Sequence, residues 1–442
     1  MSKKEEKKNI NRRNTNNLKK NKKENSKIKI SNLKNSFKKN IESKKDQIKN
    51  QIVSKKIKAN TNILEEKILE DNKSNDKDLN QQNLENNNNN SNFDNEENVD
   101  SGKNINLLNS QQDNFNEQKL KDDILYYQKK FQELRYEVSK IVVGQKEVMD
   151  YLIEAILANG HCLVEGIPGI AKTLLLRTLA VAMGCEFKRI QFTPDLLPSD
   201  IVGVTAYDEK KGFYTVKGPV FANIVLGDEI NRAPPKVQSA LLEAMQEKQV
   251  TIGKNSFPLP NPFFVMATQN PIEQMGTYPL PEAQIDRFIY KIIMKYPPME
   301  DEEKILKQNI SLKRFEDYNI VPILKPEEIV KAQEDVKKIY SDPKIEKYIV
   351  RIVDATRNPH KYNLELGKYI EFGSSPRASI SLYIASKAHA LLNGKIYVTP
   401  QDIKEVALNI FRHRIILNYE GQAEDIKTED IIKEILAKVP VV

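Results

Sequence analysis

The sequence predicts an α/β domain with a mainly parallel sheet, preceded by a disordered tail and followed by an all-helical domain. Asn and Lys dominate residues 1–118, where too few large apolar residues recur to repay the entropy of ordering the chain. Strand-like apolar runs and helical patterns then alternate across residues 119–296, which is typical of a parallel sheet. Residues 297–442 show helical periodicity only, so we expect a helical domain there.

The formal charge of +8 in 442 residues belongs to the predicted tail. Residues 1–50 carry 18 basic and 5 acidic side chains, whereas residues 101–442 carry 45 of each. The neutral ordered region therefore argues against a strong electrostatic attraction to nucleic acid. The basic half of the tail either contacts nucleic acid or an anionic membrane, or is a solvated segment without a partner.

The composition argues against membrane, secreted and metal-cluster proteins. No apolar run reaches the roughly 18 residues of a membrane-spanning helix, and the charged N-terminus lacks the apolar stretch of a secretory signal. Cys162 and Cys185 fit no metal-binding spacing, so we expect two buried free thiols in a reducing cytosol. The His residues form no ligand pair at i, i+4. These observations predict a cytoplasmic protein.

Two helices are expected before the first strand. Apolar residues recur at helical spacing across 120–141, and a second helix is expected over 147–158, where Asn159-Gly160 would end it. The apolar run 161–165 predicts a buried strand that leads into a glycine-rich turn, and a helix is expected over 174–183. Later strands of the sheet are expected at 224–229, 262–270 and 288–294.

The C-terminal region is expected to contain only helices. Pro326, Pro343 and Pro400 lie in predicted first turns, where the missing N–H group of proline has no hydrogen bond to lose. The predicted helices cover residues 300–309, 326–339, 343–356, 375–392, 400–410 and about 428–437.

The first functional motif is the glycine-rich turn. Residues 166–173 have the sequence GIPGIAKT, which is the pattern GxxxxGK[ST] with Ala171 in the place of the last glycine. Backbone N–H groups of such a loop and the N-terminus of the following helix bind phosphate oxygens. Lys172 would reach the β and γ phosphates, and the Thr173 hydroxyl would bind Mg²⁺. We expect Ala171 to be tolerated if its backbone does not need a positive φ. A structural glycine turn is the alternative.

Two strand ends carry further polar residues. Asp228 and Glu229 close the apolar run 224–229; Asp228 would hold Mg²⁺ directly or through water, and Glu229 would be the general base. An acidic pair that caps a helix is the alternative. Asn270 closes the next strand and would hold the attacking water or a γ-phosphate oxygen; a turn-forming Asn before Pro271 is the alternative.

Two arginines complete the candidate site. Arg287 precedes the strand at 288–294, and Arg377 opens a C-terminal helix. Arginine stabilises charge on a transferring phosphoryl group, either within one chain or from a neighbouring subunit. A surface salt bridge is the alternative for each.

These motifs together resemble the MoxR family of AAA+ ATPases over about residues 125–440. The similarity is carried by VVGQ at 142–145, the glycine-rich loop, GDEINRAPPKVQ at 227–238, ATQNPIE at 267–273, GTYPLPEAQ at 276–284 and SPRAS at 375–379. Ala171 is usual in this family. Gly227 stands where the family often has Ala.

The resemblance implies a P-loop AAA+ core with a mainly parallel sheet, followed by an all-helical lid domain. It also implies a ring, usually a homo-hexamer, that binds ATP and Mg²⁺ between subunits. Lys172 and Thr173 would form Walker A, Asp228 and Glu229 Walker B, Asn270 sensor 1, Arg287 an arginine finger acting on the neighbour's ATP, and Arg377 sensor 2. Val143 and Gly144 would line the adenine pocket. The residues expected to contact the nucleotide are Val143, Gly144, Gly166, Ile167, Pro168, Gly169, Ile170, Ala171, Lys172, Thr173 and Leu174.

The resemblance finally implies inserts and partners. Residues 200–218 and 249–260 would be inserts whose hairpins face the ring pore or a client. Family members are often paired with von Willebrand factor A domain proteins, and they help to mature enzyme complexes or to insert metal cofactors. We therefore expect Mg²⁺-dependent ATP hydrolysis that drives chaperone-like remodelling of protein complexes. The alternatives are a nucleic-acid-associated AAA+ motor and a non-catalytic, nucleotide-gated scaffold.

Overall fold

The computed structural model describes residues 101–441, apart from residues 211, 272–275 and 309–314, and only the backbone of residues 101–116. Residues 1–100 of the predicted disordered tail lie outside the described residues. Within the described range, no helix has both the length and the apolar character that crossing a membrane requires.

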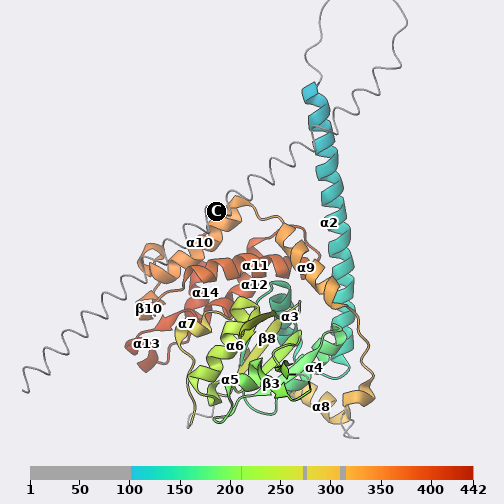
Figure 1. Ribbon diagram of the computed structural model, residues 1–442. Coiled ribbons are helices and arrows are strands. Elements are labelled where there is room, and N and C mark those ends of the chain that lie inside the picture. The colour runs from blue at the N-terminus through green and yellow to red at the C-terminus, as the bar shows by residue number, and fades with distance from the viewer. Residues whose placement is uncertain (1–100, 211, 272–275, 309–314, 442) are drawn as a thin grey trace, which may run out of the picture. The chain divides into compact units, whose positions relative to one another are not determined.

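The first described helix begins earlier than the sequence predicts. Helix α2 covers Ser101–Ser139, so the predicted boundary at residue 118 falls inside it. Its C-terminal half packs through residues at helical spacing, among them Ile124, Phe131 and Leu134, which are fully buried. Extending a helix costs less than starting one, so a packed half can be continued by a polar half. Figure 1 shows α2 as a long helix beside α9.

A five-stranded sheet forms the centre of the α/β region (Figure 1). The strand order is β2-β5-β8-β1-β9, and all four strand pairs are parallel, which confirms the predicted sheet. The carboxyl ends of the strands therefore meet at one edge, called here the carboxyl edge, and the amino ends meet at the opposite amino edge. The strands are β1 (Cys162–Gly166), β2 (Phe187–Gln191), β5 (Ile224–Asp228), β8 (Phe264–Gln269) and β9 (Tyr290–Met294).

Both faces of the sheet are covered. Successive strand residues face opposite sides, so Val164 joins the larger hydrophobic cluster with α3 and α4, whereas Leu163 joins a second cluster with α6. The larger cluster also contains residues of α11 and α12, so the α/β region and the helical region share one core. The flanking helices are α3 (Lys146–Leu157), α4 (Lys172–Ala182) and α6 (Pro235–Glu247).

Two hairpins leave the sheet at the predicted inserts. Strand β3 (Gly203–Asp208) pairs antiparallel with β4 (Gly212–Lys217), directly after the short helix α5 (Pro198–Val202). Strand β6 (Gln249–Ile252) pairs antiparallel with β7 (Asn255–Pro258) between α6 and β8.

The C-terminal region is mostly helical, and Pro326, Pro343 and Pro400 lie in first turns as predicted. The expectation of helices only was wrong, because β10 (Ile370–Phe372) and β11 (Ile416–Leu417) pair antiparallel. Strands this short leave no periodic signal in the sequence. The α-helices are α8 (Met299–Gln308), α9 (Pro326–Lys338), α10 (Pro343–Arg357), α11 (Pro376–Leu392), α12 (Pro400–Phe411), α13 (Tyr419–Ala423) and α14 (Thr428–Lys438).

Candidate nucleotide-binding site

The carboxyl edge gathers most of the predicted site residues. Gly166 ends β1, Asp228 ends β5, and Asn270 directly follows β8. Because β1 and β5 both pair with β8, these three positions lie at the ends of adjacent strands. Asn270 is buried at this edge. Burial restricts the movement of its side chain, as expected for a residue that positions a small ligand.

The glycine-rich loop connects β1 to α4. Lys172 is the first residue of α4, and its Nζ donates to Gly166 O at 2.7 Å, so the side chain lies across the loop. A Cβ atom at Gly166 would lie 2.7 Å from Ile170 Cδ1 and 3.1 Å from Met294 O, so a larger residue there would displace the Ile170 side chain. Thr173 and Leu174 follow in the first turn of α4, close to the helix N-terminus that favours anions.

Ala171 does not meet the condition under which we expected alanine to be tolerated at this position. Ala171 has φ 66° and ψ 25°, which is the left-handed conformation that usually takes glycine. The loop has to reverse direction before α4 begins, and Gly169 also has a positive φ of 84°. A non-glycine residue in this conformation costs about 1 kcal/mol, so the loop holds backbone strain at the place where phosphate would bind.

Lys172 faces the two carboxylates of the strand end. Burial lowers the pKa of its ammonium group, whereas the charges of Asp228 and Glu229 act in the opposite direction. A partly desolvated cation interacts more strongly with an anion than a solvated one does. The position therefore suits a lysine that binds phosphate oxygens.

Asp228 is held by an arginine that the sequence analysis did not single out. Arg189 on β2 donates to Asp228 Oδ2 from Nε at 3.0 Å and from Nη2 at 2.6 Å. The Arg189 side chain is 47% exposed, so this pair is only partly buried. The pairing depends on β2 lying next to β5, which the chain order alone does not reveal.

Thr268 is a second residue that the sequence analysis did not choose. Its hydroxyl donates to Asp228 Oδ1 at 2.7 Å and accepts from the backbone N–H of Glu229 at 2.9 Å. Thr268 is fully buried on β8, so it fixes both acidic positions at once. A hydroxyl at the end of an otherwise apolar strand was the signal that could have identified it.

Glu229 lies just beyond β5 in a left-handed conformation, with φ 57°. Its Oε2 accepts from Gln191 Nε2 at 3.0 Å and from Arg232 Nη1 at 3.1 Å. Gln191 Oε1 also accepts from Arg189 Nη2 at 2.5 Å. A chain of hydrogen bonds through β2 therefore links the two carboxylates.

The oxygen donors at this edge fit Mg²⁺. A threonine hydroxyl at Thr173 and a carboxylate at Asp228 are hard oxygen ligands, and Mg²⁺ typically takes one or two of these together with phosphate oxygens. No cluster of three or more His, Cys, Asp or Glu side chains suited to a metal occurs in the part of the chain that the structure describes. A dedicated all-protein metal cage is therefore absent there.

Val143 and Gly144 line a cavity of about 1450 Å³. Gly144 has φ +78°, and a Cβ atom there would lie 2.9 Å from Pro297 Cβ, so the turn needs glycine. Leu175, on the first turn of α4 after the phosphate loop, lines the same cavity. The cavity therefore extends from the predicted adenine contacts to the helix that follows the loop.

Arg287 and Arg377 do not join the carboxyl edge. The N–H of Ile289 donates to His161 O at 2.8 Å, which places the start of β9 beside the residue before β1. Gly166 pairs with Met294 at the far end of the same two strands. A five-residue strand spans roughly 13 Å, so Arg287 lies on the amino edge, away from its own phosphate loop.

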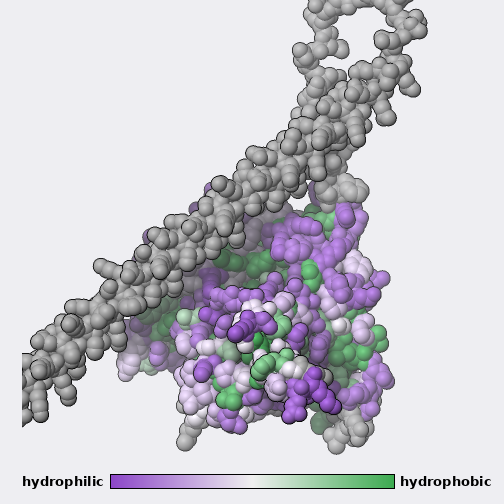
Figure 2. All heavy atoms as spheres, viewed as in Figure 1, coloured by the Kyte–Doolittle hydropathy of each residue, from purple (hydrophilic) through white to green (hydrophobic). Residues whose placement is uncertain are grey.

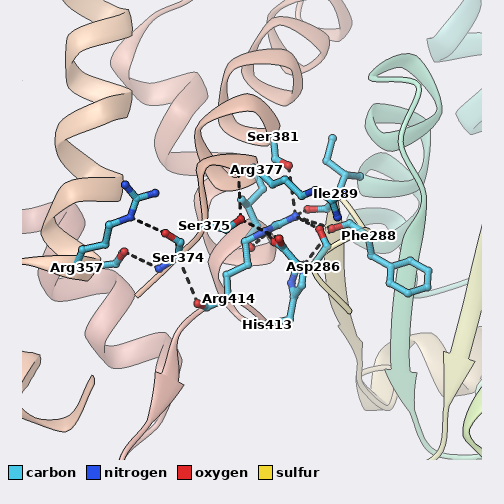
Figure 3. A network of polar contacts seen from close by, with 12 residues as sticks. Asp286, Phe288, Ile289, Arg357, Ser374, Ser375, Arg377, Ser381, His413 and Arg414 are labelled. Carbon is cyan, nitrogen blue, oxygen red and sulfur yellow. Dashed lines mark hydrogen bonds and ion pairs between the residues drawn. The ribbon is translucent and has the colours of Figure 1, made fainter. Parts of the chain in front are cut away.

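Arg377 lies at the amino edge as well. Ser375, two residues earlier, donates from Oγ to Asp286 Oδ2 at 2.8 Å. Arg377 is exposed at the start of α11, close to Asp286 in Figure 3. Both arginines thus lie at the amino edge, and the structure separates them from Lys172.

Arg287 lies in a shallow cleft of about 380 Å³ between α6 and the four-residue helix α7 (Glu282–Ile285). Its Nη1 donates to Leu242 O at 3.2 Å. Its Nε is buried and has no hydrogen-bond partner among the described residues. Its guanidinium is thus incompletely satisfied by the part of the chain that is described.

Comparison with known proteins identifies the family. The chain is 45% identical over 307 residues to "Chaperone MoxR1" of Mycobacterium tuberculosis, which covers 69% of this chain and 80% of that protein. It is 30% identical over 327 residues to "Protein MoxR" of Methylorubrum extorquens, with 69% and 93% covered. This chain belongs to the MoxR family of AAA+ ATPases. The predicted resemblance is confirmed.

Family models and a solved structure agree with this assignment. The model described as "ATPase family associated with various cellular activities (AAA)" matches residues 161–290, and an AAA lid domain model matches residues 366–435. A crystal structure of a proposed ATPase from Cytophaga hutchinsonii is 50% identical, with a TM-score of 0.70, and covers 74% of this chain and 98% of that one. As a MoxR-family AAA+ protein, the chain is an ATP hydrolase with an α/β core and a helical lid.

Proposed function

We propose that this MoxR-family protein is a Mg²⁺-dependent ATPase that works as a ring, usually a homo-hexamer, and remodels protein partners in a chaperone-like way. At the carboxyl edge, Lys172 binds the phosphates, Glu229 activates water, and Asn270 positions it. Thr173 and Asp228 hold Mg²⁺, which would neutralise charge on the transferring phosphoryl group. Val143 and Gly144 contact the adenine. Residues 166–171 and Leu174 complete the nucleotide contacts.

The observation that carries this proposal is the separation of the arginines from the phosphate loop. Arg287 and Arg377 lie at the amino edge, and the phosphate loop lies at the carboxyl edge of the same sheet. An arginine that stabilises the transition state has to contact the phosphate directly. In this fold, that contact requires the carboxyl edge of one subunit to face the amino edge of the next.

The β3–β4 hairpin supports a protein client. Phe213 and Tyr207 are 79% and 65% exposed, and their rings lie 5.1 Å apart. Figure 2 shows apolar side chains among hydrophilic ones on the face that carries this hairpin. Exposed apolar and aromatic side chains favour protein contacts. A nucleic-acid motor is not favoured, because residues 101–442 carry no net positive charge.

The proposal also includes a partner and a compartment. The name of the mycobacterial relative describes a chaperone, which favours a client protein for this chain. A von Willebrand factor A domain protein is the first partner to test. The two described cysteines, Cys162 and Cys185, are buried and free, which supports a reducing, cytoplasmic environment.

The test is a mixing experiment with two inactive variants. Lys172→Ala removes the phosphate contact, and Arg287→Ala removes the arginine that would act on the neighbour, with an expected loss of about 10³-fold in turnover. Mixed rings contain some interfaces with an intact phosphate loop facing an intact arginine, so hydrolysis should partly return. Mass photometry would confirm that the mixed rings form.

Two results would contradict the proposal. Assembled mixed rings that stay inactive would show that Arg287 does not act across the interface. Full turnover by a monomeric fraction would show that no neighbour is needed. Lys254→Ala, an exposed lysine in the turn between β6 and β7, is the control for loss of one positive charge.

A further inference from the structure

A buried arginine of the lid, Arg414, bonds the backbone beside Arg287 and lies near Arg377. It is the third residue after α12, and its side chain is only 2% exposed. Its Nε donates to Asp286 Oδ1 at 2.7 Å, which forms an ion pair between lid and core (Figure 3). Burial lowers the pKa of Arg414, Asp286 opposes that shift, and the positive charge of Arg377 adds to it. The three side chains are thus close enough to influence one another.

Arg414 also holds the backbone on both sides of Arg287. Its Nη2 donates to Asp286 O at 3.1 Å and to Phe288 O at 2.7 Å, and its Nη1 donates to Ile289 O at 3.2 Å. His413 Nε2 lies 3.0 Å from the same Phe288 carbonyl. Hydrogen bonds from a charged donor are among the stronger ones in proteins. The peptide units that flank Arg287 are therefore fixed relative to the lid.

Asp286 extends this network to Arg377. Its second carboxylate oxygen, Oδ2, accepts from Ser375 Oγ at 2.8 Å. Ser375 is the N-cap of α11, and its Oγ accepts from the backbone N–H of Arg377 at 3.2 Å. One carboxylate thus binds Arg414 through one oxygen and the helix start that carries Arg377 through the other, as Figure 3 shows.

We propose that Asp286, Arg414 and Ser375 form a clip that holds Arg287 and Arg377 at a fixed spacing, so that both arginines reach the neighbour's nucleotide together. The inference rests on the proposed function, since it needs a nucleotide on the neighbouring subunit. Arg287 belongs to the core and Arg377 to the lid, so the clip sets the position of one arginine relative to the other. Catalysis tolerates little of such movement, because a displacement of about 1 Å can cost roughly 10²-fold in rate.

The three clip residues are positioning residues, not catalytic ones. A role limited to fastening the lid onto the core would lower the stability of the subunit and affect its own nucleotide site as much as the neighbour's. The clip instead predicts a defect that appears only in the neighbour's hydrolysis. This difference can be measured in mixed rings.

The decisive variant is Ser375→Ala in the full-length chain. It removes the hydrogen bond to Asp286 and the N-cap bond to Arg377, while Arg414 keeps its counter-charge. We expect turnover to fall about tenfold, with unchanged affinity for a fluorescent ATP analogue. Thr399→Ala is the matched control, because Thr399 caps α12 in the same lid and its hydroxyl has no contact with this network. That control should lose helix-capping stability and keep its turnover.

Mixed rings then assign the defect to the interface. Ser375→Ala mixed with Lys172→Ala should recover activity, because the intact arginines of the second variant face the intact loop of the first. Ser375→Ala mixed with Arg287→Ala should not recover, because both variants are defective at the amino edge. Turnover of Ser375→Ala equal to that of Thr399→Ala, or equal recovery in both mixtures, would overturn the clip.

A second variant and one reference measurement distinguish failure of the clip from failure of the proposed function. Asp286→Asn weakens both bonds and leaves Arg414 buried without a counter-charge, so its thermal unfolding midpoint should fall together with its turnover. Full turnover of Arg287→Ala would contradict the proposed function itself. Loss of turnover in Arg287→Ala, together with normal turnover in both Ser375→Ala and folded Asp286→Asn, would contradict only the clip.

Discussion

The two edges of the parallel sheet carry polar networks of different kinds. At the carboxyl edge, Asp228 and Glu229 contact side chains such as Arg189, which is about half exposed and can exchange its partner for a ligand. At the amino edge, Arg414 is buried and donates mainly to backbone carbonyls, which have no alternative position. The carboxyl edge is therefore adjustable where nucleotide and metal would bind, and the amino edge is rigid where it would act on a neighbour.

Among the tests of this difference between the two edges, Glu229→Gln should have the largest effect. The substitution keeps the shape of the side chain and its contact with Gln191, but it removes the proposed general base. We expect turnover to fall by about 10²- to 10⁴-fold, with nucleotide affinity unchanged. Single-turnover hydrolysis and equilibrium binding would be measured on the same preparation. Normal hydrolysis in this variant would reject the base assignment.

Lys172→Ala should have the next largest effect, which is a loss of affinity for ATP. Charge-assisted hydrogen bonds contribute about 1.5–3 kcal/mol, so we expect affinity for ATP to fall by up to about 100-fold. The amino edge should remain intact, because the Lys172 ammonium group bonds to Gly166 O at the carboxyl edge. Unchanged affinity for ATP in this variant would contradict the assignment of residues 166–173 as the phosphate loop. Lys188→Ala, an exposed lysine on β2, is the control.

The sequence predicted those parts of the site that are local in the chain. The phosphate loop has a motif of eight residues, and apolar runs ending at Asp228 and Asn270 indicate buried strands with polar ends. Alternation of strands and helices predicted a parallel sheet, whose carboxyl ends meet at one edge. Motif and strand patterns were therefore enough to bring Lys172, Asp228 and Asn270 together.

The remaining parts depend on contacts between distant segments. Arg189 and Thr268 touch Asp228 only because β2 and β8 lie on either side of β5. The sequence also did not predict that Arg377 lies beside Asp286, because this depends on how the lid packs on the start of β9. The conformation of Ala171 was missed, because the cost of a positive φ can be offset by surrounding structure that a motif does not record.

Arg189→Met tests whether the carboxyl edge is adjustable. Arg189 occupies Asp228 Oδ2, so Mg²⁺ and the guanidinium would compete for one oxygen. The Arg189 side chain is about half exposed, so this ion pair should be worth less than about 1 kcal/mol. We therefore expect the Mg²⁺ concentration for half-maximal ATP binding to fall about two- to fivefold, as measured by titration without turnover.

Lys188→Met is the matched control for this experiment, because Lys188 lies on the same strand and forms an ion pair with Glu186. It removes one positive charge near the site without freeing Asp228. An equal change in both variants would indicate general electrostatics. A higher Mg²⁺ requirement in Arg189→Met would show that Arg189 orients Asp228 for the metal and does not compete with it.

The smallest expected effect concerns the strain in the phosphate loop. Ala171→Gly relieves a positive φ of 66°, which costs alanine about 1 kcal/mol. Glycine also adds about 0.4–1 kcal/mol of entropy to the unfolded chain. The variant should therefore match or exceed the wild-type free energy of unfolding by less than about 1 kcal/mol.

Ala233→Gly, at φ −95°, is the control for Ala171→Gly and should lower stability, because no strain is relieved there. If urea unfolding gives the two variants the same destabilisation, the alanine in the loop is not strained. If only Ala171→Gly is stabilised, the phosphate loop at the carboxyl edge carries backbone strain that phosphate binding can use. The clip at the amino edge would then differ from the loop, because it carries no such strain.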